Sequence, residues 1–373
     1  SSGRKANSSV PVPVSGGHTF AELSVGANFA CGRTVTGVGR CWGVFSDGRL
    51  GSNATTSANV PGLVAGGLTF TALATGDDHA CGITNAGETW CWGDGTYGQR
   101  GDGNVATKYV PTAVLGGLTF AQIVAGDAHT CGVTTMNVAY CWGPGDRLGT
   151  GSGSEGVAPV AVAGALPFTS LSIGREHTCG VTTTFAAYCW GTGTDGALGQ
   201  GSYTSSLAPV AVAGGHSFAS VAAGYRHTCA ITTVGDALCW GSNSVFQHGR
   251  GTSPAFESSP VAVSGGHRFK AIDAGKSFTC ALTLDGAAMC WGFIGVSDIG
   301  LTPLLGEPVP ALIAGNRTYA SITAGEDHAC ALTAAGAAWC WGRAFGSRLG
   351  GSTTNTIIPV LVPGGHVFSS ISA

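Results

Sequence analysis

The chain has 373 residues, of which 44% are hydrophobic and only 10% charged, and its formal net charge is −3. The hydrophobic content argues against a disordered chain. Gly, Pro, Ser and Thr interrupt each apolar run before it reaches the roughly 20 residues of a membrane span, so we expect no membrane insertion. The sequence has no Lys/Arg block that would attract phosphates, so nucleic acid is not an expected partner.

In chain order, residues 1–9 are predicted to form an N-terminal tail, and residues 10–373 to form a single propeller built from one repeat. A half-repeat spans Val10 to Val25. A similar half-repeat follows each of seven Cys-Trp-Gly tripeptides, and the last runs from Ile358 to Ala373. Seven Cys hairpins thus accompany eight half-repeats. We expect a displaced end, a longer parent protein, or spare strands that pair with a neighbouring molecule.

The repeat from Thr69 to Val114 illustrates the elements that each copy is expected to form. Short apolar segments separated by turn residues predict four strands, at Phe70–Ala74, His79–Thr84, Glu88–Trp92 and Tyr109–Val114. A Gly-rich loop precedes the fourth strand. This spacing without a helical period is typical of a propeller blade. The predicted fold is therefore all-β, a seven-bladed β-propeller of four-stranded antiparallel blades.

The 14 cysteines form seven C-x9-C pairs on the predicted second and third strands. If Cys81 faces Cys91, a three-residue loop remains, and its last position favours Gly or Asn in the left-handed conformation. Six hairpins obey this rule, and Phe185 is the exception. The register places each cysteine opposite its partner, at a Cβ separation close to disulfide range. The predicted intrablade disulfides are Cys31–Cys41, Cys81–Cys91, Cys131–Cys141, Cys179–Cys189, Cys229–Cys239, Cys280–Cys290 and Cys330–Cys340.

Two alternatives exist for these cysteines, namely buried reduced thiols and zinc ligands. Zinc sites usually contain close pairs such as C-x2-C, so a lone C-x9-C per repeat fits them poorly. Disulfides in this number indicate an oxidising compartment, and we therefore expect an extracellular, secreted or cell-surface protein. The Trp beside each Cys points to the opposite face of its strand, and we expect it to pack between blades.

The repeat resembles the regulator of chromosome condensation repeat family. The resemblance rests on Ala125-Gly126-Asp127-Ala128-His129-Thr130-Cys131-Gly132-Val133-Thr134, then Ala139-Tyr140-Cys141-Trp142-Gly143, then Arg147-Leu148-Gly149. It covers nearly the whole chain and implies a seven-bladed propeller. Members range from nuclear exchange factors to bacterial extracellular binders. The cysteine pairs and the missing basic segment differ from the nuclear members, so we expect a bacterial-type extracellular member with one disulfide per blade.

Candidate binding residues lie in two sets of loops that should share one face of the propeller. The loop between the first and second strands keeps its frame but varies in content, and it carries Asp77, Asp78, Asp127, Arg175, Glu176, Tyr225, Arg226, Lys276, Glu326 and Asp327. We expect these residues to ring the central channel, with Arg175, Arg226 and Lys276 on one arc. They either bind a partner or are simply well-hydrated turns.

The loop between the third and fourth strands is longer and should present exposed aromatic and basic side chains, which are frequent binding anchors. The candidates are Phe45, Tyr97, Arg100, Phe246, His248, Phe293 and Phe345. Asn7, Asn53 and Asn316 lie in N-x-Ser/Thr sequons, which matter only if the source glycosylates.

A histidine occupies one repeat position in five copies, at His79, His129, His177, His227 and His328, and Phe29 and Phe278 take that position in the other two. A position that also accepts Phe favours a packing role over a metal site. No catalytic constellation recurs, and we expect no metal, no cofactor and no enzyme activity. The leading hypothesis is an extracellular propeller that binds a protein or glycan through one loop face. The alternative is a structural subunit of a surface layer or filament, assembled through the surplus terminal half-repeat.

Overall fold

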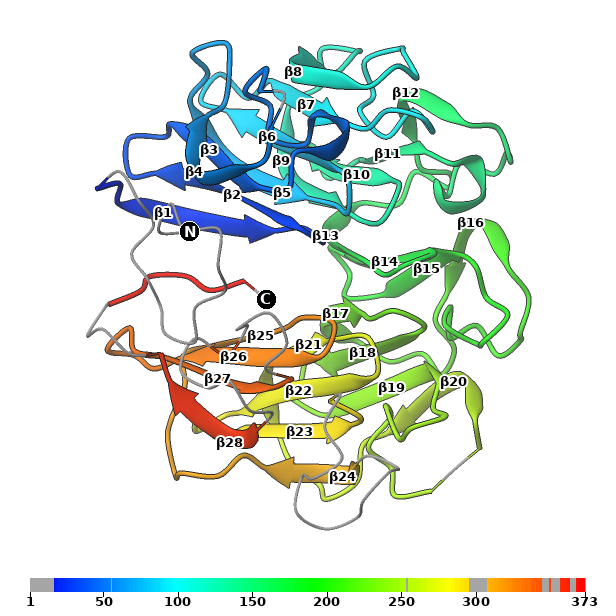
Figure 1. Cartoon of the computed structure of the whole chain (residues 1–373). Helices are drawn as coiled ribbons and strands as arrows, with labels where there is room; N and C mark the ends of the chain where they lie inside the picture. The colour runs from blue at the N-terminus through cyan, green and yellow to red at the C-terminus, as the bar shows by residue number, and fades with distance from the viewer. Residues whose placement is uncertain are drawn as a thin grey trace. The chain divides into compact units, whose positions relative to one another are not determined.

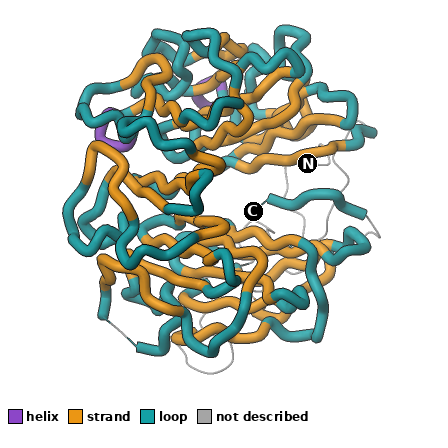
Figure 2. Tube along the Cα trace, turned by 180° about the vertical axis from the view of Figure 1, so that it is seen from behind, coloured by secondary structure: helices purple, strands orange, loops and turns teal. Residues whose placement is uncertain are grey.

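The computed structural model describes residues 17–54, 56–252, 254–294, 307–343, 349, 356–362 and 367–372. These residues form seven four-stranded antiparallel sheets, and the strands of each sheet are adjacent in chain order (Figure 1). Strands dominate the described chain, and helix is confined to two short 3-10 turns (Figure 2). We call the sheets blades 1 to 7 in chain order. The predicted all-β fold of seven four-stranded blades is confirmed.

The described residues divide into two compact units. Unit 1 contains blades 1 to 3, β13 and residues 206–209, and unit 2 contains β14, β15, residues 210–211 of β16 and blades 5 to 7. The elements that begin in unit 1 are β1 (Phe20–Val25), β2 (Phe29–Thr34), β3 (Gly39–Gly43), η1 (Ser46–Gly48), β4 (Ala58–Leu63), β5 (Phe70–Thr75), β6 (His79–Thr84), β7 (Thr89–Gly93), β8 (Lys108–Ala113), β9 (Phe120–Ala125), β10 (Thr130–Thr134), β11 (Ala139–Gly143), η2 (Gly145–Arg147), β12 (Gly156–Ala161), β13 (Phe168–Ile173) and β16 (Ser206–Ala211).

The strands of unit 2 are β14 (His177–Thr182), β15 (Ala187–Gly191), β17 (Phe218–Ala223), β18 (His227–Thr232), β19 (Ala237–Ser242), β20 (Phe256–Ala262), β21 (Phe269–Ala274), β22 (Phe278–Thr283), β23 (Ala288–Gly292), β24 (Glu307–Leu312), β25 (Ser321–Ala324), β26 (His328–Leu332), β27 (Ala338–Gly342) and β28 (Thr356–Leu361). In blade 2 the four predicted strands agree with the observed bounds to within one residue. The second strand is the core of a blade, since all six residues of β6 are buried.

The hairpin between the second and third strands has the predicted register. Cys81 faces Cys91, Gly82 faces Trp90 and Ile83 faces Thr89. All seven predicted disulfides are present, each with a Cα–Cα distance of 4.1 Å, and no cysteine is free. Phe185 has a φ of 63°, so it adopts the left-handed conformation that Gly or Asn adopts in the other hairpins. The turn geometry therefore overrides the side-chain preference at this position.

The predicted packing of tryptophans between blades is also confirmed. The disulfide of one blade packs against the indole of the next, as Cys179–Cys189 does with Trp240 and Cys229–Cys239 does with Trp291. The indole also donates a hydrogen bond to the preceding loop, as from Trp291 to the Gln247 carbonyl at 2.8 Å. Six of the seven repeat tryptophans are completely buried, and Trp42 is half-buried.

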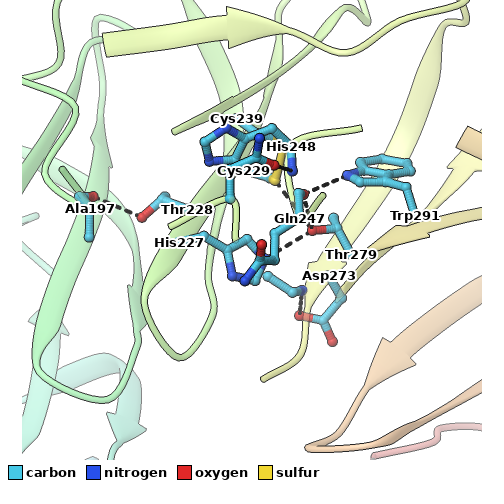
Figure 3. Close-up of a disulfide and its surroundings, with 12 residues drawn as sticks. Ala197, His227, Thr228, Cys229, Cys239, Gln247, His248, Asp273, Thr279 and Trp291 are labelled. Carbon is cyan, nitrogen blue, oxygen red and sulfur yellow. Dashed lines mark hydrogen bonds between the residues drawn. A yellow bond between two sulfur atoms is a disulfide. The ribbon is translucent and has the colours of Figure 1, made fainter. Parts of the chain in front are cut away.

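The repeat histidine forms a polar joint between blades (Figure 3). His177 Nε2 lies 2.8 Å from Thr228 Oγ1. His227 Nε2 lies 3.0 Å from Thr279 Oγ1, and Figure 3 draws this second pair. The hydroxyl of Thr279 donates to the Gln247 carbonyl at 3.2 Å, so we infer that the imidazole Nε2–H is the donor to the threonine. Burial lowers the pKa of His177 to about 4 and that of His227 to about 3, so both rings are neutral at pH 7.

Where the histidine is replaced, its partner changes as well. Phe29 packs in one cluster with Ala80, and Phe278 packs in one cluster with Ala329. The joint is therefore either a hydrogen-bonded His–Thr pair or an apolar Phe–Ala pair. This confirms the packing role that we predicted for the position, because the His–Thr pair satisfies the buried Nε2–H of the ring and the Phe–Ala pair has no polar side-chain atom.

A second joint connects the first strands of neighbouring blades. Asp273 accepts hydrogen bonds from the Ala274 amide at 3.0 Å and from the Ala324 amide at 2.8 Å. Burial raises the pKa of Asp273 to about 6 against the opposing effect of these bonds. In blade 1, Ser24 accepts a bond from the Thr75 amide of blade 2 at 3.0 Å without introducing a charge.

The loop that receives the indole contains a Leu-Gly step with a buried side chain before the glycine. Gly51 has a φ of 61°, and a Cβ there would lie 2.7 Å from the ring of Trp92. Leu50, Leu148, Leu198 and Leu349 fill the preceding position and are at most 1% exposed. Arg100 and His248 occupy the same repeat position and are also completely buried. The repeat thus places two polar side chains where it otherwise places leucine.

The two polar side chains, Arg100 and His248, differ in how many hydrogen bonds they make. Arg100 donates to both carboxylate oxygens of Asp102 at 3.0 Å and also to the Ala106 carbonyl. Among the described residues, neither ring nitrogen of His248 makes a hydrogen bond of normal geometry. Burial lowers the pKa of His248 to about 4, although the backbone of Trp240 and Gly241 favours the charged ring. His248 is therefore a buried polar group without adequate compensation.

The His–Thr joint can be tested with a double-mutant cycle in blades 4 and 5. Thr228→Ala removes the acceptor of His177 and should lower the free energy of unfolding by about 1–3 kcal/mol, because the buried Nε2–H loses its partner. His177→Phe/Thr228→Ala recreates the Phe–Ala joint and should recover most of that loss. The second single variant, His177→Phe, completes the cycle, and calorimetry of the three variants measures the coupling. Simple additivity of the losses in Thr228→Ala and His177→Phe would contradict the joint.

Replacing His248 with leucine should stabilise the protein, increasingly so at acid pH. The folded pKa of about 4 lies below the ordinary value of 6.5, so the unfolded chain binds more protons between these pH values. The wild type should therefore lose up to about 3 kcal/mol relative to His248→Leu as the pH falls from 7 to 4. Thermal unfolding at pH 7, 5.5 and 4.5 measures this difference.

Arg100→Leu is the matched control for His248→Leu, because it makes the same change at the same repeat position in blade 2. It should destabilise the protein at each pH, since Asp102 would keep a buried carboxylate without its cation. If Arg100→Leu and His248→Leu changed the stability of the protein equally, the hydrogen bonds of Arg100 would not explain a difference between the two sites.

Candidate functional site

The two sets of candidate loops lie on the same side of their blades, as predicted. In unit 2 Arg226, from a first-to-second loop, lies 3.2 Å from Asp195, in a third-to-fourth loop. In blade 7 Arg343 lies 3.5 Å from Asp327. In unit 1 Arg49 forms an ion pair with Asp78 across blades 1 and 2. Charged side chains of the two loop sets therefore contact each other within each unit.

A glycine at the end of each first strand fixes the spacing of these loops in unit 2. A Cβ on Gly174 would collide with the Gly224 carbonyl, and one on Gly275 would collide with the Gly325 carbonyl. The backbones of adjacent blades meet here because no side chain separates them. The following loops are also hydrogen-bonded, from the Lys276 amide to the Glu326 carbonyl at 3.3 Å. The loop side chains are thus presented by rigid neighbours.

These loops bring together a row of side chains that we call the Tyr225 cluster, consisting of Arg175, Tyr225, Arg226, Lys276 and Glu326. The Arg175 guanidinium carbon lies 4.6 Å from the centre of the Tyr225 ring, and the Lys276 ammonium lies 5.4 Å from it. Lys276 also lies 3.4 Å from Glu326. Arg175 and Lys276 thus both lie beside Tyr225, whose loop stands between theirs in chain order. The side chain of Arg226 is 54% exposed and that of Lys276 41% exposed, so both remain accessible.

A polar depression adjoins the Tyr225 cluster. It is lined by Glu176, His177, Thr192, Thr194, Asp195, Ala197, Tyr225 and Arg226. His177 is held in its blade joint, whereas the hydroxyl and carboxylate groups of the lining can exchange hydrogen bonds with a ligand. The cluster and the depression together offer cations, an aromatic ring and hydrogen-bond acceptors on one surface of unit 2.

The candidate acids of unit 1 form a different electrostatic environment. Burial raises the pKa of Asp78, the Arg49 guanidinium opposes that shift, and the carboxylates of Asp47, Asp94 and Asp127 add to it. Asp127 lies 3.9 Å from Arg147. Asp77 is exposed at the tip of its loop. The acidic candidates Asp78 and Asp127 therefore pair with arginines of unit 1, as Glu326 and Asp327 pair with cations of unit 2.

In the third-to-fourth loops, the structure contradicts the predicted exposure of two residues. Arg100 and His248 were predicted to be exposed anchors, but both are completely buried because they take the place of the repeat leucine. Tyr97 is 48% exposed, and Phe45, Phe246 and Phe293 are half-buried. Phe345 lies outside the described residues. Alignment of Arg100 and His248 with Leu50 and Leu148 was the signal that could have revealed their burial.

Residues that the sequence did not single out complete the surface. Asp195 holds Arg226, and Arg49 spans Asp47 and Asp78. Within the described residues no group of three or more His, Cys, Asp or Glu side chains could hold a metal ion. No helix in this part of the chain is long and apolar enough to cross a membrane. Asn53 and Asn316 are exposed in loops, and Asn7 lies outside the described residues.

Comparison with protein families identifies the repeat. A family model described as the regulator of chromosome condensation (RCC1) repeat matches residues 86–133 and 186–231. A second model with the same description matches residues 70–99, 218–247, 269–293 and 319–345. The matches fall on blades 2 to 7. No curated protein matches the chain at a significant level.

Solved structures share the fold at low sequence identity. Prp20p from Saccharomyces cerevisiae is 19% identical, with a TM-score of 0.74 over 89% of this chain and 87% of that chain. Human WBSCR16 is 20% identical, with a TM-score of 0.75 over 89% of this chain and 95% of that chain. The CRINKLY WD40 ectodomain of the Arabidopsis thaliana receptor kinase ACR4 is 20% identical, with a TM-score of 0.54 over 93% of this chain and 99% of that chain. The matches of both repeat models, together with the seven blades, support a protein of the regulator of chromosome condensation repeat family.

Proposed function

We propose that the protein is an extracellular, non-enzymatic binding propeller that recognises a partner protein through the Tyr225 cluster. The observation that carries the proposal is the grouping of Arg175, Tyr225 and Lys276 from three successive blades. Tyr and Arg are enriched among residues that dominate binding energies at protein interfaces. Rigid loops also reduce the entropy that such residues lose on binding.

A protein partner is the better-supported choice of ligand class. The Saccharomyces cerevisiae relative Prp20p is described by its binding to Gsp1p and histones, both of which are proteins. The charges of both signs around Tyr225 also suit a protein partner, since a protein surface can offer carboxylates to the cations and cations to the carboxylates. A glycan is the alternative, because the Thr192 and Asp195 side chains of the depression could bind sugar hydroxyls.

The extracellular location is supported by the seven disulfides. Cysteine pairs of this number persist in oxidising compartments, whereas cytosolic thiols are kept reduced. The plant relative of the same fold is an ectodomain of a receptor kinase. A bacterial-type extracellular member of the family remains our proposal for this chain on the same grounds.

Tyr225→Ala should weaken capture of a partner at least about tenfold, as expected for loss of an interface anchor. The purified protein, labelled and immobilised, would be exposed to the secreted protein fraction of its source and in parallel to a glycan array. Cross-linking mass spectrometry would then locate each captured molecule on the chain. Cross-links at Lys276, lost in Tyr225→Ala, support the proposal, and glycan-array binding without protein capture would change the ligand class.

Tyr109→Ala is the matched control, because Tyr109 is 42% exposed on the outer strand β8 and lies outside the candidate loops. It should capture the partner as the wild type does. Equal capture by Tyr225→Ala and wild type would overturn the site. Equal loss in both tyrosine variants would point to a general loss of structure.

The extracellular location can be tested on the wild-type protein isolated from its source. Alkylation of the material before reduction should label none of the 14 cysteines, because an oxidising compartment keeps all seven pairs closed. Mass spectrometry of the alkylated peptides measures the free thiols. Substantial labelling of Cys31 or its counterparts would place the protein in a reducing compartment and contradict export.

The structural alternative, a subunit that assembles with copies of itself, does not use the Tyr225 cluster. It depends instead on the surplus half-repeat at the end of the described chain.

A further inference from the structure

A pocket of about 470 Å³ lies on blade 6 of unit 2, at the end of the strands away from the Tyr225 cluster. Its walls come from the loop that leads into β21 and from the hairpin between β22 and β23. The loops of the Tyr225 cluster join first to second strands, so antiparallel pairing places them at the opposite strand ends. The volume is in the range that protein pockets offer to ligands. The lining includes His267, Arg268, Leu284, Asp285, Met289 and Leu312.

The pocket exists because the repeat omits an aromatic side chain in blade 6. Four blades carry a Trp or Tyr directly before the second cysteine, and these residues are Trp90, Tyr140, Tyr188 and Trp339. All four are half-buried, so their rings reach the surface of the blade. Met289 takes this position in blade 6 and is 6% exposed. This thinner side chain ends below the surface and forms the floor of the pocket.

Leu312 supplies the second feature that blade 6 needs to form a pocket. It faces Met289 in the sheet register and is 58% exposed. In blade 5 the equivalent pair is Leu238 and Ala262, and the short alanine side chain provides no such wall. Leu284, in the hairpin of blade 6, is 60% exposed and forms the other wall. Blade 6 therefore combines a recessed floor with two projecting leucines.

Blade 7 shows which group the same position holds when it is filled. The Arg317 guanidinium carbon lies 3.6 Å from the centre of the Trp339 ring. His267 of the pocket occupies the repeat position of Arg317, and its ring meets Phe269 edge-on with 6.1 Å between the ring centres. A flat ring on Met289 would lie beside this imidazole, as the Trp339 ring lies beside the guanidinium. Thioether sulfur also contacts aromatic rings favourably, so the floor suits an aromatic group.

Two charged side chains at the rim can hold the groups that flank such a ring. Arg268 lies 3.4 Å from Asp236 through Nε and donates to the Val234 carbonyl through Nη1. These contacts fix the guanidinium and leave Nη2 to donate to a ligand. Asp285 is exposed and offers carboxylate oxygens as acceptors. A donor and an acceptor beside the ring match the carbonyl and N–H groups of a peptide backbone.

The exposed leucines favour a polypeptide over a small aromatic molecule as the ligand. A ring on the floor would leave the outer parts of Leu284 and Leu312 in water. Val234, in the adjacent hairpin of blade 5, is also exposed. A chain that continues on both sides of the ring would cover these apolar side chains as well, and that burial adds to the affinity.

We propose that this pocket binds a tryptophan or tyrosine side chain of a partner polypeptide. The ring rests on Met289 between the two leucines, and the flanking backbone bonds to Arg268 and Asp285. The partner thereby supplies the ring that the repeat itself supplies in blades 2, 3, 4 and 7. The site uses no residue of the Tyr225 cluster, so it does not depend on the function proposed for that cluster.

Met289 gives a direct measurement of binding, because the chain contains two methionines. The other, Met136, is 80% exposed in the hairpin of blade 3 and serves as the internal reference. Protein labelled with carbon-13 at the methionine methyl groups would be titrated with the capped peptide Ala-Ala-Trp-Ala-Ala, and with Ala-Ala-Leu-Ala-Ala as the matched control. The Trp peptide should shift the Met289 signal through its ring current and leave Met136 unmoved. The Leu peptide should bind at least about tenfold more weakly.

Met289→Trp should abolish binding of the Trp peptide, because it fills the pocket with the ring that Trp339 supplies in blade 7. Leu238→Trp places the same residue at the same repeat position in blade 5, outside the pocket, and should bind as the wild type does. Saturation-transfer NMR of the peptide's indole protons measures binding in both variants, and thermal unfolding verifies their folding. Tyr225→Ala should also bind the peptide as the wild type does, whatever its effect on partner capture.

Several results would overturn the proposal. These are equal shifts of the Met289 and Met136 signals, equal affinity for the Trp and Leu peptides, and retained binding in a folded Met289→Trp variant. Equal affinity for the Trp peptide and for N-acetyltryptophanamide would overturn the assignment to a polypeptide, since the flanking residues would then contribute nothing. If Met289→Trp disturbs blade 6, the titrations of the wild type decide by themselves.

Discussion

The face-to-face cysteine pair of each hairpin sets the orientation of the side chains around it. Because neighbours on a strand alternate faces, a disulfide on one face places the following tryptophan on the other. Within each unit, a blade then presents a disulfide to the next blade and an indole to the preceding one, as the packing of Cys179–Cys189 on Trp240 shows. The Leu-Gly loop closes around that indole. One repeated register therefore generates both the blade and the contact that stacks blades.

This packing also explains where variation is tolerated. The His–Thr joint converts to Phe–Ala only when both partners change, because a buried donor needs its acceptor. Arg100 at a leucine position is accommodated by Asp102 and nearby carbonyls, whereas His248 has no comparable set of partners. In contrast, the loop residues after the close-packed glycines contact solvent and each other. They can differ from blade to blade without disturbing the joints.

The proposed binding surface follows from that separation of roles. Gly174 and Gly275 bring adjacent backbones together, and the loops that follow carry Arg175, Tyr225 and Lys276 at a spacing fixed by the blades. A surface assembled from successive repeats gains its specificity from which side chain each repeat supplies. Function in this protein is thus proposed to depend on departures from the repeat.

The amino-acid sequence alone determined the blade architecture, the hairpin register and all seven disulfides, because these depend on local alternation and on a repeat that can be counted. It also indicated the structural role of the histidine position through its exchange with phenylalanine. Tertiary structure decided which candidate side chains are accessible. Arg100 and His248 are buried, since exposure depends on contacts with the neighbouring blade that no single repeat contains. It also decided that Tyr225 lies between Arg175 and Lys276, since their loops are some 50 residues apart in the chain and meet only when blades pack.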